Sequence, residues 1–249
     1  MQLGLIGYPL GHSLSPQIFE GFFQEAGIKG SYKLYPLENI TVLRDWLKTQ
    51  RNLSGFNVTI PHKKTIIPFL DSISPEAKAI GSVNTVKVTR TDNSLHLYGH
   101  NTDNFGFRTT LEEFLGGYLP KKALVLGTGG TSNTVAYVLE QLGIACVKVS
   151  RQVNNEAPLT YEDISNHTLK SYELIVNTTP LGMYPAIKTF PHIPYEALTP
   201  KHYLYDLVYN PVDTLFLQKG REFGANTCNG VAMLQLQARK SWEIWNRAD

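Results

Sequence analysis

Two ionisable residues, Lys63 and Asp103, stand in short polar segments that could supply a proton-transfer pair. Lys63 ends the segment 57–63 (NVTIPHK), and Asp103 ends the segment 99–103 (GHNTD). Each lies among small hydrogen-bonding residues, which is the composition expected where a polyhydroxylated ligand binds. An ammonium held beside a carboxylate can donate and accept one proton at a reacting oxygen. The pattern alone leaves open that Lys63 is simply an exposed residue at a helix start.

The segment around Lys63 is predicted to be a strand that leads into a helix. Phe56, Val58 and Ile60 alternate with polar residues at the two-residue period of a strand, so the apolar members are expected to face a core. Pro61 cannot donate to a sheet but suits the first turn of a helix. Lys63 is therefore expected at the carboxyl end of a strand, where ligands of open α/β sheets bind.

A second candidate site is a glycine turn in the second half of the chain. Residues 123–126 (ALVL) are predicted to form a strand, and residues 131–142 a helix closed by Gly143. Such a turn lets the backbone approach a pyrophosphate, and the helix amino terminus offers unpaired N–H groups. The match to G-x-G-x-x-G is imperfect because Ser132 takes the last position, so an ordinary tight turn is the alternative. The candidate cofactor-binding residues here are Gly127, Thr128, Gly129, Gly130 and Thr131.

The next predicted strand, residues 146–149, bears on the choice of dinucleotide. An NAD site usually has an acidic residue after this strand to hold the ribose hydroxyls. This chain has Ser150 and Arg151 instead. Because a guanidinium matches the 2′-phosphate in charge and fork geometry, the sequence favours NADP. A solvated loop arginine is the alternative.

Composition agrees with an enzyme of small polar metabolites. The 249 residues suffice for one large or two modest domains, and strand-like and helix-like segments alternate as in α/β proteins. The net charge of +2, without runs of like charge, argues against a nucleic-acid or membrane surface. No segment approaches the roughly 20 apolar residues of a membrane span or resembles a signal peptide, so we expect a cytoplasmic protein.

Neither the cysteines nor the histidines indicate a disulfide or a metal. Cys146 and Cys228 are far apart in sequence and outside any metal-type spacing, and Cys146 is expected to be a buried strand residue. The seven histidines are scattered, without an H-E-x-x-H motif or a cysteine cluster. We therefore expect no bound metal.

Seven segments resemble, in order, the signature blocks of the shikimate dehydrogenase family. They are residues 11–16 (GHSLSP), 57–63 (NVTIPHK), 81–85 (GSVNT), 101–103 (NTD), 177–183 (NTTPLGM), 206–211 (DLVYNP) and 229–234 (NGVAML). The resemblance runs from Gly7 to about Trp245, nearly the whole chain. Any single block would be weak, but seven in the right order are specific.

The resemblance implies two α/β domains with a cleft between them. A substrate-binding catalytic domain would comprise residues 1–102, completed by a C-terminal helix over 230–249, and a Rossmann-like NADP-binding domain would comprise residues 103–229. The implied activity is the reversible, NADPH-dependent reduction of 3-dehydroshikimate to shikimate, in chorismate and aromatic amino-acid biosynthesis. The implied partners are this small-molecule substrate and, for a homodimer, a second copy; a monomer is equally compatible.

The resemblance also assigns roles to single residues. Lys63 would donate the proton, and Asp103 would hold its ammonium and a substrate hydroxyl. Substrate would be bound by Ser13, Ser15, Asn57, Thr59, Asn84, Thr102, Tyr209 and Gln237, and Thr178, Leu207 and Gly230 would join the cofactor site. Other readings stay open for three of these. Ser15 could be only the N-cap of a helix that starts at Pro16, Tyr209 a half-buried aromatic, and Gln237 a surface residue.

Three positions depart from the family's commonest pattern. Ser150 and Gln152 stand where many members have Asn and Thr, and Asn133 stands where an Arg often follows the glycine turn. These departures bear on the preference between NADP and NAD. Three alternative functions stay open: a quinate or dual-specificity dehydrogenase that uses NAD, a non-catalytic shikimate-binding regulatory protein, and a general metabolite dehydrogenase.

Overall fold

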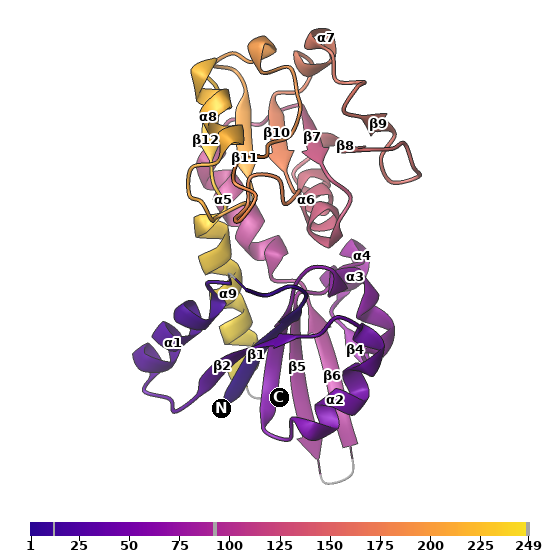
Figure 1. Cartoon of the computed structure of the whole chain (residues 1–249), viewed down its shortest axis with the longest axis vertical. Coiled ribbons are helices and arrows are strands. Elements are labelled where there is room, and N and C mark those ends of the chain that lie inside the picture. Colours follow the sequence, from indigo (N-terminus) through magenta and orange to yellow (C-terminus); the bar gives the residue numbers. More distant parts are fainter. Residues whose placement is uncertain (12, 92–93, 248–249) are drawn as a thin grey trace. The chain divides into compact units, whose positions relative to one another are not determined.

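The chain forms two compact units. The computed structural model describes residues 1–11, 13–91 and 94–247, so His12 of the first signature segment lies outside the described residues. Unit 1 comprises Met1–Phe105 and the chain from Gln235 onward, and unit 2 comprises Gly106–Leu234. Both divisions fall within helices, α5 (Asp103–Leu115) and α9 (Val231–Asn246) (Figure 1). The boundaries predicted from the sequence lie at the starts of these same helices.

Unit 1 contains a mixed sheet with strand order β2-β1-β3-β5-β6-β4. β1 pairs in parallel with β2 and β3, β5 pairs antiparallel with β3 and β6, and β4 pairs in parallel with β6. The strands are β1 (Gln2–Gly7), β2 (Ser31–Pro36), β3 (Leu53–Val58), β4 (Ser72–Ile73), β5 (Thr85–Thr91) and β6 (Ser94–His100). The helices are α1 (Ser15–Ala26), α2 (Leu43–Thr49), α3 (His62–Thr65) and α4 (Pro75–Ile80), with 3₁₀ turns at Ile40–Val42 and Ile67–Phe69.

Two apolar clusters hold unit 1 together. One lies around Leu43, Phe56 and Leu97, and it packs α2 against the sheet. The other joins Phe19 of α1 to Trp242 and Trp245 of α9 and includes Leu3 of β1. Burial of these side chains fixes α1 and α9 to the sheet because each large side chain contributes roughly 1.5–3 kcal/mol.

One local prediction for unit 1, that Ile60 faces a core, was wrong, and one alternative, that Ser15 is an N-cap, is contradicted. Ser15 is the first residue of α1, not its N-cap, because the N-cap position belongs to Leu14, which makes no side-chain cap. Ile60 does not face a core. β3 ends at Val58, where its pairing with β1 ends, and Ile60 is 56% exposed in the turn before α3. α1 ends at Ala26 because Gly27 takes the left-handed conformation (φ 64°) that closes a helix.

Unit 2 contains an all-parallel sheet with strand order β12-β11-β10-β7-β8-β9. The strands are β7 (Lys122–Leu126), β8 (Ala145–Ser150), β9 (Leu159–Thr160), β10 (Leu174–Asn177), β11 (Tyr203–Asp206) and β12 (Asn226–Cys228). The helices are α6 (Gly130–Gln141), α7 (Asn166–Leu169) and α8 (Leu215–Glu222), with a 3₁₀ turn at Tyr195–Ala197. Counted from β7, this is the 3-2-1-4-5-6 order of a dinucleotide-binding fold.

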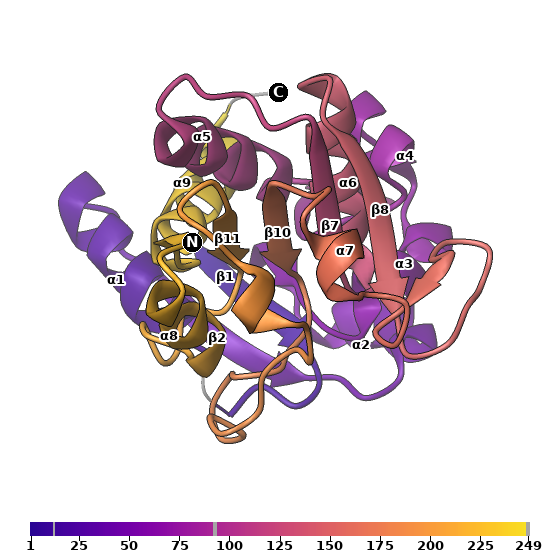
Figure 2. The ribbon, with the colours of Figure 1, turned by 90° about the horizontal axis from the view of Figure 1, so that it is seen from above.

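Apolar clusters cover both faces of this sheet. α5 and α6 cover one face of the sheet, and α7 and α8 lie on the other (Figure 2). Phe107 and Val135 belong to the cluster of the first face, and Leu169 and Phe216 to that of the second. A parallel sheet needs both faces covered, which explains why its central strands are nearly all apolar. Cys146 lies on β8 as predicted but is half-buried.

Candidate active site

Lys63 and Asp103 form a shielded ion pair in unit 1. Lys63 is the second residue of α3 and Asp103 the first residue of α5. The ammonium Nζ lies 2.5 Å from Asp103 Oδ2, and the two side chains are only 14% and 6% exposed. Charges this shielded from water are stable only when paired and hydrogen-bonded. Asp103 meets that condition on both oxygens, because its Oδ1 accepts from Asn84 Nδ2 at 2.9 Å.

Three further predicted substrate residues surround the ion pair. Asn84 Oδ1 accepts the backbone N–H of Thr102 at 2.7 Å, and Asn84 Nδ2 donates to Thr102 Oγ1 at 3.0 Å. Gln237 of α9 brings its Oε1 to 3.4 Å from Asn84 Nδ2 and 3.5 Å from Thr102 Oγ1. Residues from α3, α5, α9 and the segments that precede β5 and α5 therefore meet in one hydrogen-bonded cluster. We call it the lysine cluster: Lys63, Asn84, Thr102, Asp103 and Gln237.

Asn57 joins the lysine cluster through two hydroxyls that the sequence did not single out. Asn57 Nδ2 donates to Thr85 Oγ1 at 2.9 Å and to Ser241 Oγ at 3.0 Å, and both hydroxyl residues are fully buried. Each of these hydroxyls also lies 3.1 Å from Thr102 Oγ1. Thr85 stands in a signature segment without an assigned role. Ser241 is one small residue in a long helix, and no local pattern marks it.

Tyr32 orients Asn57 from the other side. Its hydroxyl donates to Asn57 Oδ1 at 2.8 Å, and its ring stacks on Phe19 with centroids 4.3 Å apart. The amide of Asn57 therefore has protein partners for its oxygen and its nitrogen. This fixes which way the amide points, and it could not be read from the sequence because Tyr32 lies on a different strand.

The hydrogen bonds described for Ser13, Ser15 and Thr59 lie outside the lysine cluster. Ser13 Oγ accepts the backbone N–H of Ser15 at 3.2 Å, at the start of α1. Thr59 directly follows β3, where its N–H donates to Ile6 O at 2.9 Å. Ser15 is buried, and the other two are half-buried.

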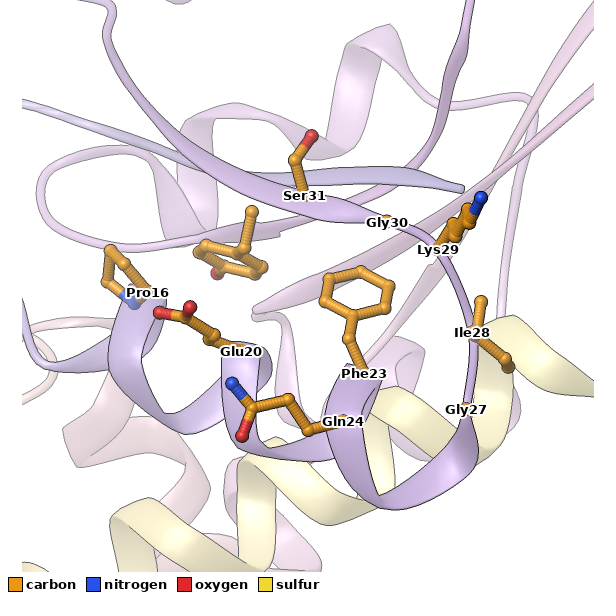
Figure 3. Close-up of a pocket in the computed structure, with 10 residues that line it drawn as sticks. Pro16, Glu20, Phe23, Gln24, Gly27, Ile28, Lys29, Gly30 and Ser31 are labelled. Atoms are coloured by element: carbon orange, nitrogen blue, oxygen red, sulfur yellow. The ribbon is translucent and has the colours of Figure 1, made fainter.

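A pocket on unit 1 lies beside α1, and Tyr32, the partner of Asn57, belongs to its lining. Figure 3 shows it between α1 and the start of β2, with the ring of Phe23 and the carboxylate of Glu20 along its side. Gly30 passes so close to Phe23 that a Cβ there would lie 2.1 Å from the ring. The pocket is lined by none of the residues predicted for substrate or cofactor.

The glycine turn of unit 2 has the geometry of a phosphate cradle. Gly127 has φ +114°, and a Cβ there would lie 2.7 Å from Thr178 Oγ1, so both the conformation and the space require glycine. Gly129 is the N-cap of α6; it makes no side-chain cap, and nothing lies within 4 Å of the place where its Cβ would be. The space beside Gly129 therefore leaves room for a diphosphate to approach the amino terminus of α6. Gly127, Gly129 and the start of α6 are therefore suited to the diphosphate of a dinucleotide cofactor.

The imperfect position of the glycine motif has a structural explanation. Ser132 Oγ donates to the carbonyl oxygen of Gly127 at 2.7 Å, and Ser132 is fully buried. Its hydroxyl closes the turn in place of a third glycine. Thr178 lies at the end of β10, next to β7, where its hydroxyl donates to Leu126 O at 2.6 Å. This is the point at which the strand order reverses and at which such sheets bind ligands.

Two more predicted cofactor residues contact each other. A Cβ at Gly230 would lie 2.2 Å from the carbonyl oxygen of Leu207, and Gly230 N–H donates to Val208 O at 3.1 Å. Tyr209 follows in the same loop and is half-buried, and burial raises the pKa of its phenol. The phenol therefore stays protonated and can donate a hydrogen bond.

Asp206, which carried no predicted role, fixes this loop to its neighbour. The carboxylate is fully buried and accepts from Thr214 Oγ1 at 2.6 Å, Asn177 Nδ2 at 2.9 Å and Val208 N–H at 3.0 Å. Burial raises the pKa of Asp206 to about 6, although these three hydrogen bonds oppose the shift. Asp206 thereby ties the carboxyl ends of β10 and β11 together.

Ser150 and Arg151 lie where β8 ends. Ser150 is the last strand residue, and its hydroxyl bonds both to the carbonyl oxygen of Gln152 and, at 3.1 Å, to the N–H of Gln152. Arg151 is exposed. The strand end thus presents a guanidinium and no carboxylate at these two positions.

The described part of the chain contains neither a candidate membrane span nor a cluster of candidate metal ligands. No helix there is long and apolar enough to cross a membrane. No group of three or more His, Cys, Asp or Glu residues there could hold a metal ion.

The all-parallel sheet and its open glycine turn place unit 2 in the class of Rossmann-type dinucleotide-binding domains. Residues 5–86, in unit 1, match the family model described as the shikimate dehydrogenase substrate binding domain. The chain is also 37% identical to the shikimate dehydrogenase (NADP⁺) of Methanococcus maripaludis, across 98% of this chain and 90% of the relative. It therefore belongs to the shikimate dehydrogenase family.

Solved structures agree with this assignment. The shikimate 5-dehydrogenase of Thermus thermophilus, in complex with NADP(H) and shikimate, aligns with a TM-score of 0.82 at 30% identity, covering 99% of this chain and 93% of that one. The quinate dehydrogenase of Corynebacterium glutamicum, in complex with NAD, aligns with a TM-score of 0.83 at 28% identity and the same coverage.

Proposed function

We propose that this protein catalyses the reversible, NADPH-dependent reduction of 3-dehydroshikimate to shikimate, a step of chorismate and aromatic amino-acid biosynthesis. Its family membership and the relatives named for this activity support the proposal. The observation that carries it is the shielded Lys63–Asp103 ion pair, surrounded by the amides and hydroxyls of the lysine cluster. An apolar pocket could not bind so polar a substrate.

Lys63 and Asp103 manage the proton. Reduction of a ketone needs a hydride at carbon and a proton at oxygen, and the hydride is the contribution of NADPH when it is bound. Lys63 Nζ gives the proton to the ketone oxygen and takes it back in the reverse direction. Asp103 holds the ammonium through Oδ2, and Asn84 keeps the carboxylate in place through Oδ1.

The remaining predicted residues bind and orient the substrate. Ser13 and Ser15 would hold its carboxylate, since the amino terminus of α1 favours an anion. Asn84, Thr102, Thr59, Gln237 and Tyr209 would bond its hydroxyl groups. Asn57 would act chiefly through Thr85 and Ser241, because its amide oxygen and nitrogen already have protein partners. Holding the ketone in one orientation is itself a large part of the rate.

Unit 2 would hold the dinucleotide mainly by its backbone. The turn from Gly127 to Thr131 would bind the pyrophosphate at the start of α6. Arg151 and Ser150 would bind the 2′-phosphate of the adenosine ribose, which makes NADP the expected cofactor. Thr178, Leu207 and Gly230, at the ends of β10 and β11 and before α9, would line the nicotinamide side.

A turnover assay tests the proposal directly. Purified protein is incubated with shikimate and either NADP⁺ or NAD⁺, and the absorbance of the reduced nicotinamide is followed. We expect turnover with NADP⁺ and much less with NAD⁺. The absence of turnover with either cofactor, in protein shown to be folded, would contradict the proposed activity.

One alternative has a specific observation in its favour. The chain is also similar to a quinate dehydrogenase bound to NAD, and Ser150, Gln152 and Asn133 depart from the commonest NADP-type pattern. Quinate supplied with NAD⁺ in the same assay separates the two activities. A non-catalytic regulatory protein would instead bind shikimate without turning it over. The cytoplasmic location and the monomeric or homodimeric state stay predictions from the sequence.

A further inference from the structure

A second cation lies close to the end of β8. Lys148 stands two residues before Ser150, so the two side chains leave the strand on the same face. Its side chain is only 14% exposed. Lys148 Nζ donates to Asn133 Oδ1 of α6 at 2.6 Å, and Glu156 Oε2 lies at 3.7 Å. Lys148 thus connects the helix that follows the glycine turn to the strand that precedes Arg151.

Of these two partners, only Glu156 carries a charge, and its contact with Lys148 is loose. Asn133 offers a neutral amide oxygen, and the Glu156 side chain is 50% exposed at a distance longer than a hydrogen bond. A pair of this kind, with one partner half in water, is held together only weakly. An anion that can reach Lys148 therefore replaces Glu156 at little cost.

The fold indicates which anion that is. In a sheet of this order, the adenosine ribose lies near the carboxyl end of the strand after the glycine turn, which is β8. We propose that Lys148, held by Asn133, recognises the 2′-phosphate of NADP together with Arg151, and that Glu156 is the carboxylate which this phosphate replaces. This role rests on the proposed function, and it adds Lys148, Asn133 and Glu156 to the residues that select NADP over NAD. It also accounts for Asn133, where the resemblance leads one to expect an arginine, because the cation comes from β8 instead.

The two cations would contribute differently. Arg151 is exposed and can bind a phosphate through two parallel N–H donors, whereas Lys148 is a point charge fixed in position by an amide. NAD has a hydroxyl group in place of the phosphate, so it leaves the Lys148–Glu156 contact undisturbed. Removal of Lys148 should therefore weaken NADP binding and spare NAD binding. Removal of the Glu156 charge should strengthen NADP binding.

Calorimetric binding to the whole protein tests this without turnover. The ligands are NADP⁺, NAD⁺, 2′,5′-ADP and 5′-AMP, and the variants are Lys148→Met, Lys148→Arg, Glu156→Gln and Arg151→Ala. Lys122→Met, on the exposed start of the neighbouring strand β7, is the matched control. Lys148→Met should weaken NADP⁺ and 2′,5′-ADP about 10- to 100-fold, the range for a hydrogen bond to a charged group, and change NAD⁺ and 5′-AMP less than about 2-fold.

The remaining variants keep the test decisive if Lys148→Met does not fold. Lys148→Arg should retain the preference for the phosphorylated ligands, and Glu156→Gln should tighten NADP⁺ without tightening NAD⁺. Equal losses for NADP⁺ and NAD⁺ in Lys148→Met, or a Glu156→Gln variant with wild-type affinities, would overturn the role of Lys148 while leaving the proposed function intact. A wild-type protein that binds neither dinucleotide would overturn both.

Discussion

The two units of this protein hold their candidate functional residues in different ways. In unit 1, Lys63, Asn84, Thr102 and Asp103 are fixed by bonds between side chains, and their neighbours Thr85 and Ser241 are fully buried. In unit 2, the turn that begins at Gly127 presents backbone, and Arg151 is exposed.

The difference follows from the two tasks. Proton transfer needs an ammonium in one orientation, so the side chain must be held by others. A diphosphate is bound by N–H groups of a helix start, so side chains must be kept away. Asp206 is the exception in unit 2. It is a fully buried side chain whose hydrogen bonds set the backbone of two loops.

Removal of the Lys63–Asp103 ion pair is the strongest test of the claim that unit 1 depends on side chains held by other side chains. Lys63→Ala removes the proton donor, and Asp103→Asn removes the charge that holds it, so either change should lower turnover by roughly 10²–10⁴-fold. Single-turnover hydride transfer at saturating ligands measures the effect, with circular dichroism as the folding control.

The double variant shows whether the two residues act as one unit. It should be little worse than the poorer single variant, because groups that serve the same step are strongly non-additive. Simple multiplication of the two losses would contradict a shared step. A nearly normal rate in Lys63→Ala would remove Lys63 as the proton donor.

In unit 2, the corresponding test is the effect of Asp206 on the pH dependence of stability. The folded-state pKa is about 6 and the ordinary value 3.8, so the native protein binds more protons than the unfolded chain between these values. Protonated Asp206 therefore contributes stability below about pH 4. This contribution, on the order of 3 kcal/mol, is lost as the pH rises to about 6. Asp206→Asn should flatten that slope. Amide exchange of β10 and β11 between pH 4 and 6 measures it; equal slopes in both proteins would contradict the burial effect.

The hydroxyls behind the lysine cluster should matter mostly for stability. Thr85→Val keeps the shape of the side chain but removes a partner of Asn57 and Ser241, which should cost about 1–3 kcal/mol. Thr91→Val, at the exposed end of the same strand, is the control and should change stability by at most about 0.5 kcal/mol. Thermal unfolding compares the two, and similar melting points would show that the network contributes little.

The serines at the start of α1 should give the smallest effects. Ser13→Ala or Ser15→Ala removes one proposed bond to the substrate carboxylate, so shikimate affinity should fall by about 0.5–3 kcal/mol. NADP⁺ affinity should stay the same. If calorimetry finds shikimate affinity unchanged, Ser13 has only the local role seen here, accepting the N–H of Ser15.

Local sequence patterns predicted a strand or helix well where the residues of that element alone determine its bounds. The strand at β7, the glycine turn and the helix after it were expected within one residue of their observed bounds. The lysine cluster was expected from residue types and resemblance, and the structure brings Lys63, Asn84, Thr102, Asp103 and Gln237 together.

What escaped prediction depends on contacts between distant segments. Ser241 reaches Asn57 from α9, and Tyr32 reaches it from β2, and neither position carries a local signal. Asp206 was visible in a signature segment, but its burial follows from the packing of two parallel strands. The alternating pattern wrongly predicted that Ile60 faces a core. The strand ends at Val58 because its pairing with β1 ends there, and alternation in the sequence does not show where pairing ends.

The entry of α9 into unit 1 sets the order in which the nascent protein can mature. Unit 1 needs Ser241 beside Asn57 and Trp245 beside Gly55, where the indole Nε1 also donates to Val86 O at 2.9 Å. The ribosome adds these residues only after all of unit 2, which is a single continuous stretch. Unit 2 can therefore complete its core during translation, while unit 1 waits with its polar interior open. A stalled chain that ends before Ser241 should thus acquire dinucleotide affinity before it acquires affinity for shikimate.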